Sequence, residues 1–158
     1  MALHLEVEEG FGRVWPRFIT RHASPDFDSA AVSLDDLRLS LLMLFRGAGG
    51  EAGVSLEAAS PRELLVRRSL LQQVAGTCQQ LPVAWFDGDS LRLPGRLAVY
   101  PDPALNRELY CWLALLAAHS QAMRHWVKDN QAWTCALLAR YPSLRLRYQR
   151  LVEALLPL

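Results

Sequence analysis

Cysteine and histidine are the residue types of this chain best suited to covalent or metal chemistry. The cysteines are Cys78, Cys111 and Cys135. Their odd number and wide spacing argue against a disulfide framework and fit a reducing compartment. The possible soft metal ligands are His22, His119, His125, Cys111 and Cys135. None has a spacing such as C-x-x-C or H-x-x-x-H, so no metal site is predicted. A nucleophile formed by Cys111 or Cys135 with a histidine stays open, because such residues meet in space rather than in sequence.

Motifs that bind phosphate, dinucleotides or catalytic zinc are absent or misplaced. Neither G-x-x-x-x-G-K-[ST] nor H-E-x-x-H occurs. The segment 47–52 loosely matches a dinucleotide fingerprint, but its glycines follow a predicted helix instead of a strand, so they are interpreted as a helix C-cap and loop. Asp87 and Asp89 could bind a cation, although a turn alone explains both. No catalytic, cofactor-binding or metal-binding residue is therefore predicted.

Arginines supply the remaining candidates. Arg67 falls among leucines on a helical wheel, which fits a snorkelling side chain, an ion pair with another element or a partner contact. The stretch 124–150 holds six positive residues and one acid, interleaved with aromatic residues. It is interpreted as a solvated face over an aromatic core, with a protein interface or a nucleic-acid face as alternatives. The candidate partner-interface residues are Arg67, Arg124, Trp126, Arg145, Arg147 and Arg150.

The composition limits the classes of protein to which the chain can belong. It has 158 residues, a net charge of +1, 51% hydrophobic residues and 21% charged residues. This indicates one folded domain over 1–158, and it excludes a disordered tail and disfavours a nucleic-acid module. The first residues lack the positive charge and apolar core of a signal peptide, and no apolar run is long enough to span a bilayer. A cytoplasmic location without membrane insertion is predicted.

The elements that must position these residues are predicted to be mostly helices. Apolar periodicity and caps predict helices over about 5–21, 33–46, 60–75, 102–120, 129–141 and 143–156. The second is apolar nearly all round, which predicts a central helix, and the fourth is predicted to be the core helix. Strands 83–86 and 91–93 around the turn 87–90 predict a hairpin, and 53–56 is a possible extended piece. The expected fold class is all-α, a compact bundle of about six helices with one small hairpin near 83–93.

Several segments resemble one known family. They are 70–78, the hairpin with Leu93-Pro94, 105–114, 14–21, 45–50 and 129–131. Over nearly the whole chain, this pattern is similar to the N-terminal region of the NorD/CbbO family. Pro16 departs from the family pattern. The resemblance marks Asn106, Arg107 and Tyr110 as signature positions, and it supplies no catalytic residue.

The resemblance implies an adaptor and not an enzyme. Members of this family are large proteins that end in a metal-binding von Willebrand factor A domain and work with a hexameric MoxR-class AAA+ ATPase. The D-x-S-x-S signature of that domain is absent here, so the divalent metal would lie downstream and ATP on the partner. The main expectation is the N-terminal interaction domain of a CbbO-like adaptor that couples the ATPase CbbQ to the activation of inhibited Rubisco. The alternative is a NorD-type adaptor for nitric oxide reductase activation. More remote alternatives are a small Cys/His enzyme and a nucleic-acid-binding domain.

Overall fold

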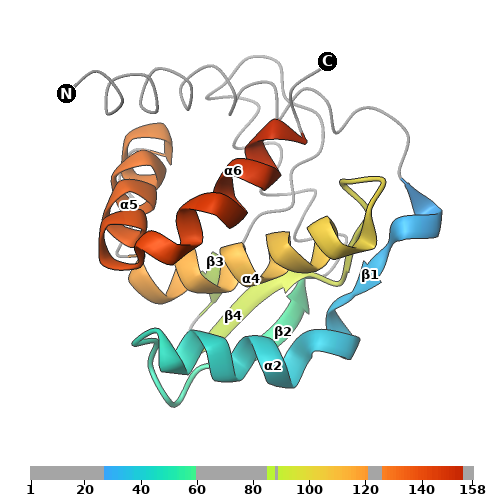
Figure 1. The fold of residues 1–158 in the computed structure, drawn as a ribbon. Helices are drawn as coiled ribbons and strands as arrows, with labels where there is room; N and C mark the ends of the chain where they lie inside the picture. The colour runs from blue at the N-terminus through green and yellow to red at the C-terminus, as the bar shows by residue number, and fades with distance from the viewer. Residues whose placement is uncertain (1–26, 60–84, 88, 121–125, 155–158) are drawn as a thin grey trace, which may run out of the picture.

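The computed structural model describes residues 27–59, 85–87, 89–120 and 126–154. The α-helices in this part are α2 (Leu34–Gly47), α4 (Pro103–His119), α5 (Trp126–Arg140) and α6 (Arg145–Glu153). Short 3-10 helices are η1 (Asp28–Ala30) and η2 (Pro142–Leu144). Figure 1 shows α4 crossing the middle of the molecule between α6 and α2, with strands of a small sheet behind it. The predicted first and third helices lie outside the described residues.

Two small sheets make the fold mixed α/β, so the prediction of an all-α bundle is wrong. The strands are β1 (Val32–Ser33), β2 (Ser55–Ala59), β3 (Trp85–Asp87), β4 (Ser90–Pro94) and β5 (Arg96–Leu97). One sheet has the order β2-β4-β3, in which β2 runs parallel and β3 antiparallel to β4. The other pairs β1 with β5 in antiparallel fashion. The predicted hairpin is confirmed as β3 and β4, and the possible extended piece near 53–56 is a true strand, β2.

The parallel pair β2–β4 was not predicted because its two strands are far apart in the chain. Leu56 lies opposite Leu91, and both side chains are buried in the core. Because side chains alternate between the faces of a sheet, the flanking residues Ser55 and Glu57 lie on the other face. A short strand with one buried leucine carries little periodicity of its own, so only its partner identifies it.

Helix α4 is the core helix, as predicted. Asp102 caps it by accepting a hydrogen bond from the Ala104 N–H at 2.8 Å, and Pro103 occupies its first turn. Its buried residues are Asn106, Leu109, Tyr110 and all residues from Trp112 to Ala117. Helices α2, α5 and α6 all contact it. A helix surrounded in this way needs apolar residues on nearly every side, and its sequence has them.

Helix α2 begins at the predicted cap but is not central. The Asp35 N–H donates to Ser33 Oγ at 3.3 Å, and Leu41 is buried at the inner face. On the outer side, however, Leu39 is 77% exposed and Met43 is 74% exposed. The prediction of a central helix is therefore wrong. A helix that is apolar all round can be buried on any side, but its sequence does not show which sides the rest of the chain covers.

The glycines after α2 form a helix C-cap, as interpreted from the sequence. The Gly50 N–H donates to the Phe45 carbonyl at 2.9 Å and the Gly49 N–H donates to the Arg46 carbonyl at 3.0 Å. These are the paired hydrogen bonds of a Schellman motif. Gly49 has a φ of 103°, and a Cβ on Gly50 would lie 2.3 Å from the Phe45 ring. Both positions therefore require glycine for reasons of backbone and packing.

The two helices that end the described chain pack on α4. Helix α5 begins earlier than predicted: Asp129 and Asn130, the expected caps, lie inside its first turns, and Asn130 is buried. Pro142 opens η2, which leads directly into α6. Helix α6 is amphipathic, and Tyr148 and Leu151 lie on its buried side.

Candidate partner-binding surface

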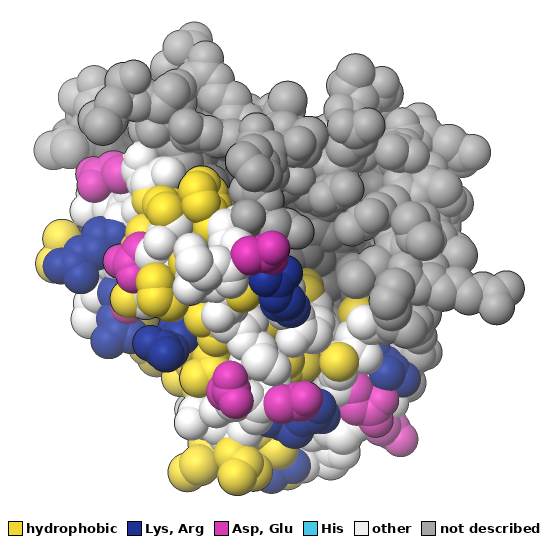
Figure 2. All heavy atoms as spheres, turned by 90° about the vertical axis from the view of Figure 1, so that its right-hand side faces the viewer, with side chains coloured by type: hydrophobic (Ala, Val, Ile, Leu, Met, Phe, Trp, Pro, Cys, Tyr) yellow, Lys and Arg dark blue, Asp and Glu magenta, His cyan; other side chains and the backbone are white. Residues whose placement is uncertain are grey.

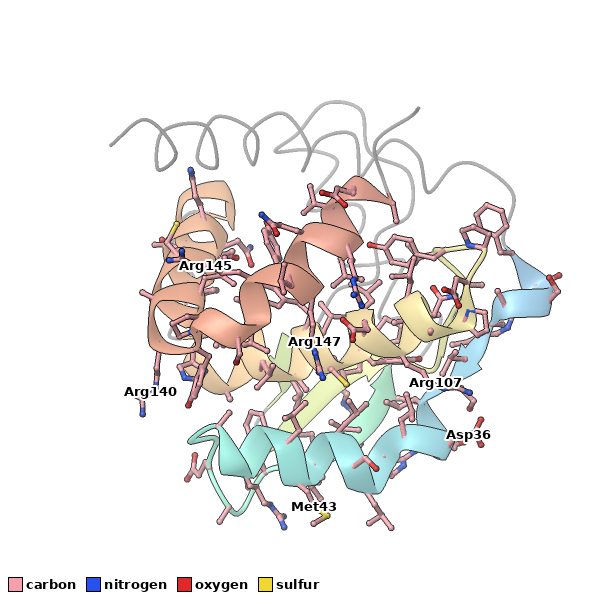
Figure 3. All side chains as sticks on the ribbon, in the orientation of Figure 1. Asp36, Met43, Arg107, Arg140, Arg145 and Arg147 are labelled. Atoms are coloured by element: carbon pink, nitrogen blue, oxygen red, sulfur yellow. The ribbon has the colours of Figure 1, made fainter. Side chains whose placement is uncertain are left out.

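Three of the predicted interface arginines are exposed on α6. Arg145, Arg147 and Arg150 are exposed, while the same helix turns Tyr148 and Leu151 toward the core. The prediction that the arginines lie outside the apolar stripe is confirmed. We call Arg145, Arg147 and Arg150 the basic α6 surface; Figure 3 labels the first two on the helix.

The other predicted interface residues fall where the structure places no side chain. Arg67 and Arg124 lie outside the described residues. Trp126 is the first residue of α5, but its side chain is not described. Sequence reasoning missed Leu146, which lies between the arginines and is 70% exposed. The sequence signal for its exposure was its position on α6, on the side away from Tyr148 and Leu151. Arginine is enriched at protein interfaces, and the exposed leucine adds apolar surface that a partner could cover.

The basic α6 surface begins at the positive end of its helix. Arg145 and Arg147 occupy the first turn, which contains no acidic residue and no capping side chain. Because the N-terminus of a helix carries a partial positive charge, each such cation costs about 0.3–1 kcal/mol. The dipole of α6 therefore gives no reason for these two arginines.

Neighbouring acids neutralise little of this positive charge. Arg147 Nε lies 3.7 Å from Glu108 Oε1, with 61% of the arginine side chain exposed. A pair with that exposure contributes about 0–1 kcal/mol. Within the described part of the chain, Arg145 and Arg150 make no ion pair. The charge is left available to an acidic partner.

Buried tyrosines hold α6 in place. The Tyr148 ring packs on Trp112 with 4.7 Å between ring centroids, and the Tyr100 hydroxyl donates to the Leu151 carbonyl at 2.9 Å. Burial raises the pKa of both tyrosines far above the ordinary value, so both stay neutral at physiological pH. The basic α6 surface is thus carried by a helix that is fixed to the core.

Asn106 joins three backbone segments inside the protein. Its Oδ1 accepts hydrogen bonds from the N–H groups of Val99 at 2.9 Å and Tyr100 at 3.0 Å. Its Nδ2 donates to the carbonyls of Ala30 at 2.8 Å and Tyr100 at 2.9 Å. The side chain is 0% exposed, and all four of its hydrogen-bonding positions are used. We call this arrangement the Asn106 hub; it fixes the loop before α4 against η1.

The other two signature positions suggested by the resemblance have different surroundings. Tyr110 is 0% exposed, and its hydroxyl donates to the Pro94 carbonyl at 2.7 Å. Arg107 is exposed on α4. The buried signature residues therefore hold the fold together, and only Arg107 is accessible to a partner.

The outer face of the β2–β4 pair carries a polar cluster that sequence reasoning missed. Ser55 Oγ lies 3.0 Å from Ser90 Oγ, and both hydroxyls donate to Glu57 Oε1 at 3.3 Å. Glu57 Oε2 lies 2.7 Å from a terminal nitrogen of Arg92. The sequence signal for this cluster was the pairing of polar residues across the two strands, Ser55 with Ser90 and Glu57 with Arg92. Because the arginine already pairs with the carboxylate, the cluster is interpreted as a cross-strand support of the sheet.

The hypothesis of a Cys–His nucleophile gains no support from the described residues. Burial raises the pKa of the Cys111 thiol, nearby Glu108 raises it further, and Arg147 lowers it. A reactive cysteine needs the opposite shift. His119 is two turns farther along α4, about 12 Å by helical rise, and its Nδ1 lies 3.0 Å from the Leu115 carbonyl. Cys135 is exposed, and Cys78 and His125 lie outside the described residues.

None of the helices in the described part of the chain combines the length and the apolar character that crossing a membrane demands. That part also contains no group of three or more His, Cys, Asp or Glu side chains placed to hold a metal ion.

Comparison with known proteins shows what this chain is similar to. It is 61% identical over its whole length to a protein named NorD from Stutzerimonas stutzeri and 34% identical over 96% of its length to one from Brucella abortus. An uncharacterised protein from Pseudomonas aeruginosa is 60% identical over 98% of the chain. The chain spans about a quarter of the length of these relatives. No family model matches it, and no solved structure is significantly similar.

Proposed function

We propose that this chain, homologous over its whole length to a segment of NorD proteins, is the part of a NorD-type adaptor that binds a MoxR-class AAA+ ATPase during activation of nitric oxide reductase. The observation that carries the proposal is the 61% identity with a NorD protein across all 158 residues. The named relatives favour this branch over the expected CbbO-like Rubisco activase. In this proposal ATP is bound by the partner, and a divalent metal by a von Willebrand factor A domain outside this chain.

The basic α6 surface is the contact that we propose for the ATPase. It presents Arg145 and Arg150 without an ion pair in the described structure, together with the exposed side chain of Leu146. An acidic patch on the ATPase would neutralise the two arginines and cover the leucine. Such a contact would form quickly and weaken as salt is added, because exposed charges are screened.

The two remote alternatives, a nucleic-acid-binding domain and a small Cys/His enzyme, lack support of this kind. Base stacking on single-stranded nucleic acid uses exposed aromatic rings. Among the described aromatic residues of the basic stretch, Tyr148 is buried, and Trp133 and Tyr141 are half-buried. The Arg140 guanidinium lies 5.6 Å from the centre of the Tyr141 ring, so that ring already has a cation over it. A thiol enzyme would need a lowered thiol pKa, which Cys111 does not have.

The test measures binding of the chain to its cognate ATPase hexamer by calorimetry at low and high salt. We expect saturable binding that weakens with salt. The double substitution Arg145→Glu with Arg150→Glu should weaken it by at least tenfold, since two ion pairs become repulsions. Arg46→Glu is the matched control, because Arg46 is exposed on a different helix, α2, and it should change the affinity less than threefold.

Three results would contradict the proposal. One is a wild-type chain that does not bind the hexamer at low salt. Another is equal weakening by the double substitution and the control, which would reject the basic α6 surface. The third uses the Stutzerimonas stutzeri NorD protein: if deleting the segment that matches this chain leaves ATPase binding unchanged, the segment is not the contact.

A further inference from the structure

The outer side of α2 carries an exposed apolar pair between charges of opposite sign. Leu39 and Met43 are 77% and 74% exposed, and they are neighbours at i, i+4 spacing. Asp36 lies about one turn before them and Arg46 about one turn after them, and both are exposed. In Figure 3, Met43 points away from the rest of the molecule, and Figure 2 shows hydrophobic side chains in the open at the lower edge of the molecule. We call these four residues the outer face of α2.

The spacing within the outer face matches that of a helix-pairing seam. Positions 36, 39, 43 and 46 are separated by three, four and three residues, which is the spacing of the a and d positions in a coiled coil. Residues with this spacing form a nearly straight row along a helix. The row is thus shaped to pack along a second helix, with the apolar pair in the middle and a charge at each end.

The row is also chemically complementary to itself when reversed. Suppose that two copies of α2 pack antiparallel around a two-fold axis that crosses the helices at the level of residue 41. Asp36 of each copy then faces Arg46 of the other. Leu39 of each copy then faces Met43 of the other. Every contact occurs twice, as a two-fold interface requires. The antiparallel arrangement also places the positive end of each helix beside the negative end of its neighbour.

We propose that the outer face of α2 is a self-association surface, whose occupant is α2 of a second copy of this chain. The proposal stands apart from ATPase binding, since it uses residues of another helix. Its motivation is the charge complementarity of a row that otherwise exposes two large apolar side chains to water. A single helix pair is a small interface, so the dimer is expected to form and dissociate readily with concentration.

The helix's own electrostatics explain only part of this arrangement. An acid near the N-terminus and a base near the C-terminus of a helix complement its dipole, which accounts for Asp36 and Arg46. The dipole gives no reason to expose Leu39 and Met43. Arg38 pairs with Asp35 at 2.5 Å, so the neighbouring acid is already engaged inside one copy. Asp36 and Arg46 form no ion pair among the described residues, and both are available to a second copy.

The test is sedimentation of the chain over a wide concentration range. We expect a monomer–dimer equilibrium that Leu39→Glu and Met43→Glu each weaken at least tenfold, because each substitution places a charge in the apolar centre twice per dimer. Leu146→Glu is the matched control: it removes an equally exposed leucine from α6 and should leave self-association unchanged.

A charge swap tests the antiparallel arrangement itself. Asp36→Arg alone brings arginine opposite Arg46 of the other copy, and Arg46→Asp alone brings two aspartates together. Each should weaken the dimer about tenfold, because both ends of the interface become repulsive. The double variant Asp36→Arg with Arg46→Asp restores opposite charges at both ends and should recover most of the affinity. Circular dichroism of every variant checks that the helix content is unchanged.

Several outcomes would overturn the proposal. They are a wild-type chain that stays monomeric at its highest soluble concentration, a dimer that survives the Leu39 and Met43 substitutions, and a double variant as weak as the single ones. None of these results bears on binding of the ATPase by α6.

Discussion

Replacing Asn106 tests whether the Asn106 hub holds the fold together. Asn106→Ala removes all four hydrogen bonds of the side chain, and three of these are fully buried. A buried partner left without a hydrogen bond costs about 1–3 kcal/mol. Water entering the space lowers that cost, so we expect a loss of about 3–5 kcal/mol. A domain of this size has a total stability of about 5–15 kcal/mol, so the loss is a large fraction of it.

A second variant, Asn106→Asp, should make the stability of the protein depend on pH in a predictable direction. The aspartate keeps the shape of the side chain, but its second oxygen faces the carbonyls of Ala30 and Tyr100, to which the amide donated. A protonated carboxyl can donate to one of them, whereas a carboxylate repels both, so the pKa of this carboxyl should rise above the unfolded value of about 3.9. The folded state then binds more protons, and the stability of the variant should fall as pH rises from about 4 through that raised pKa.

The assay is urea unfolding followed by tryptophan fluorescence at pH 5 and pH 8. The wild type at both pH values corrects for other groups. Tyr110→Phe is a control that leaves one buried partner, the Pro94 carbonyl, without its hydrogen bond, and should cost about 1–3 kcal/mol. A loss below about 1 kcal/mol for Asn106→Ala would refute the hub as a stabilising element. Equal stability of the aspartate variant at the two pH values, relative to wild type, would refute the proposed hydrogen-bond directions.

Two further predictions concern the C-cap of α2 and the cysteines. Gly50→Ala should lower stability by about 1–3 kcal/mol, because the new Cβ collides with the Phe45 ring. Gly47→Ala, with open space around its Cβ, should be neutral or slightly stabilising; equal losses in thermal unfolding would contradict this. Under native conditions iodoacetamide should label exposed Cys135 before half-buried Cys111, whose thiol pKa is raised. Peptide mass spectrometry checks the order, and faster labelling of Cys111 would refute it.

Local signals in the sequence were enough to predict the helices that carry their own caps. Asp102 and Pro103 mark the start of α4, and Ser33 marks the start of α2. These signals work because the cap and the hydrogen-bonded N–H lie within a few residues of each other. The start of α5 was missed because Asp129 is as favourable inside a first turn as at the cap.

Features that depend on distant partners were not predictable in this way. The β2–β4 pair joins Ser55 to Ser90, and Asn106 binds the backbone of Ala30, 76 residues earlier. An asparagine in a helix gives no sign of which carbonyls it will meet. The candidate site was predicted in part for the same reason: the apolar stripe of α6 places Arg145, Arg147 and Arg150 on its exposed side, but nothing local shows what they bind.

The parallel β2–β4 pair also decides when the chain can fold during synthesis. The paired residues of the two strands are 35 positions apart, so β2 has no local partner, whereas β4 can first form its hairpin with β3. The leucines of β4 belong to the same buried core as the apolar residues of α4, and α4 comes later in the chain. Such non-local contacts form slowly, because the chain between the two strands must lose the entropy of loop closure before any contact stabilises the pair. A nascent chain that ends before α4 therefore leaves apolar side chains of β4 uncovered, and exposed strands of this kind are prone to aggregate.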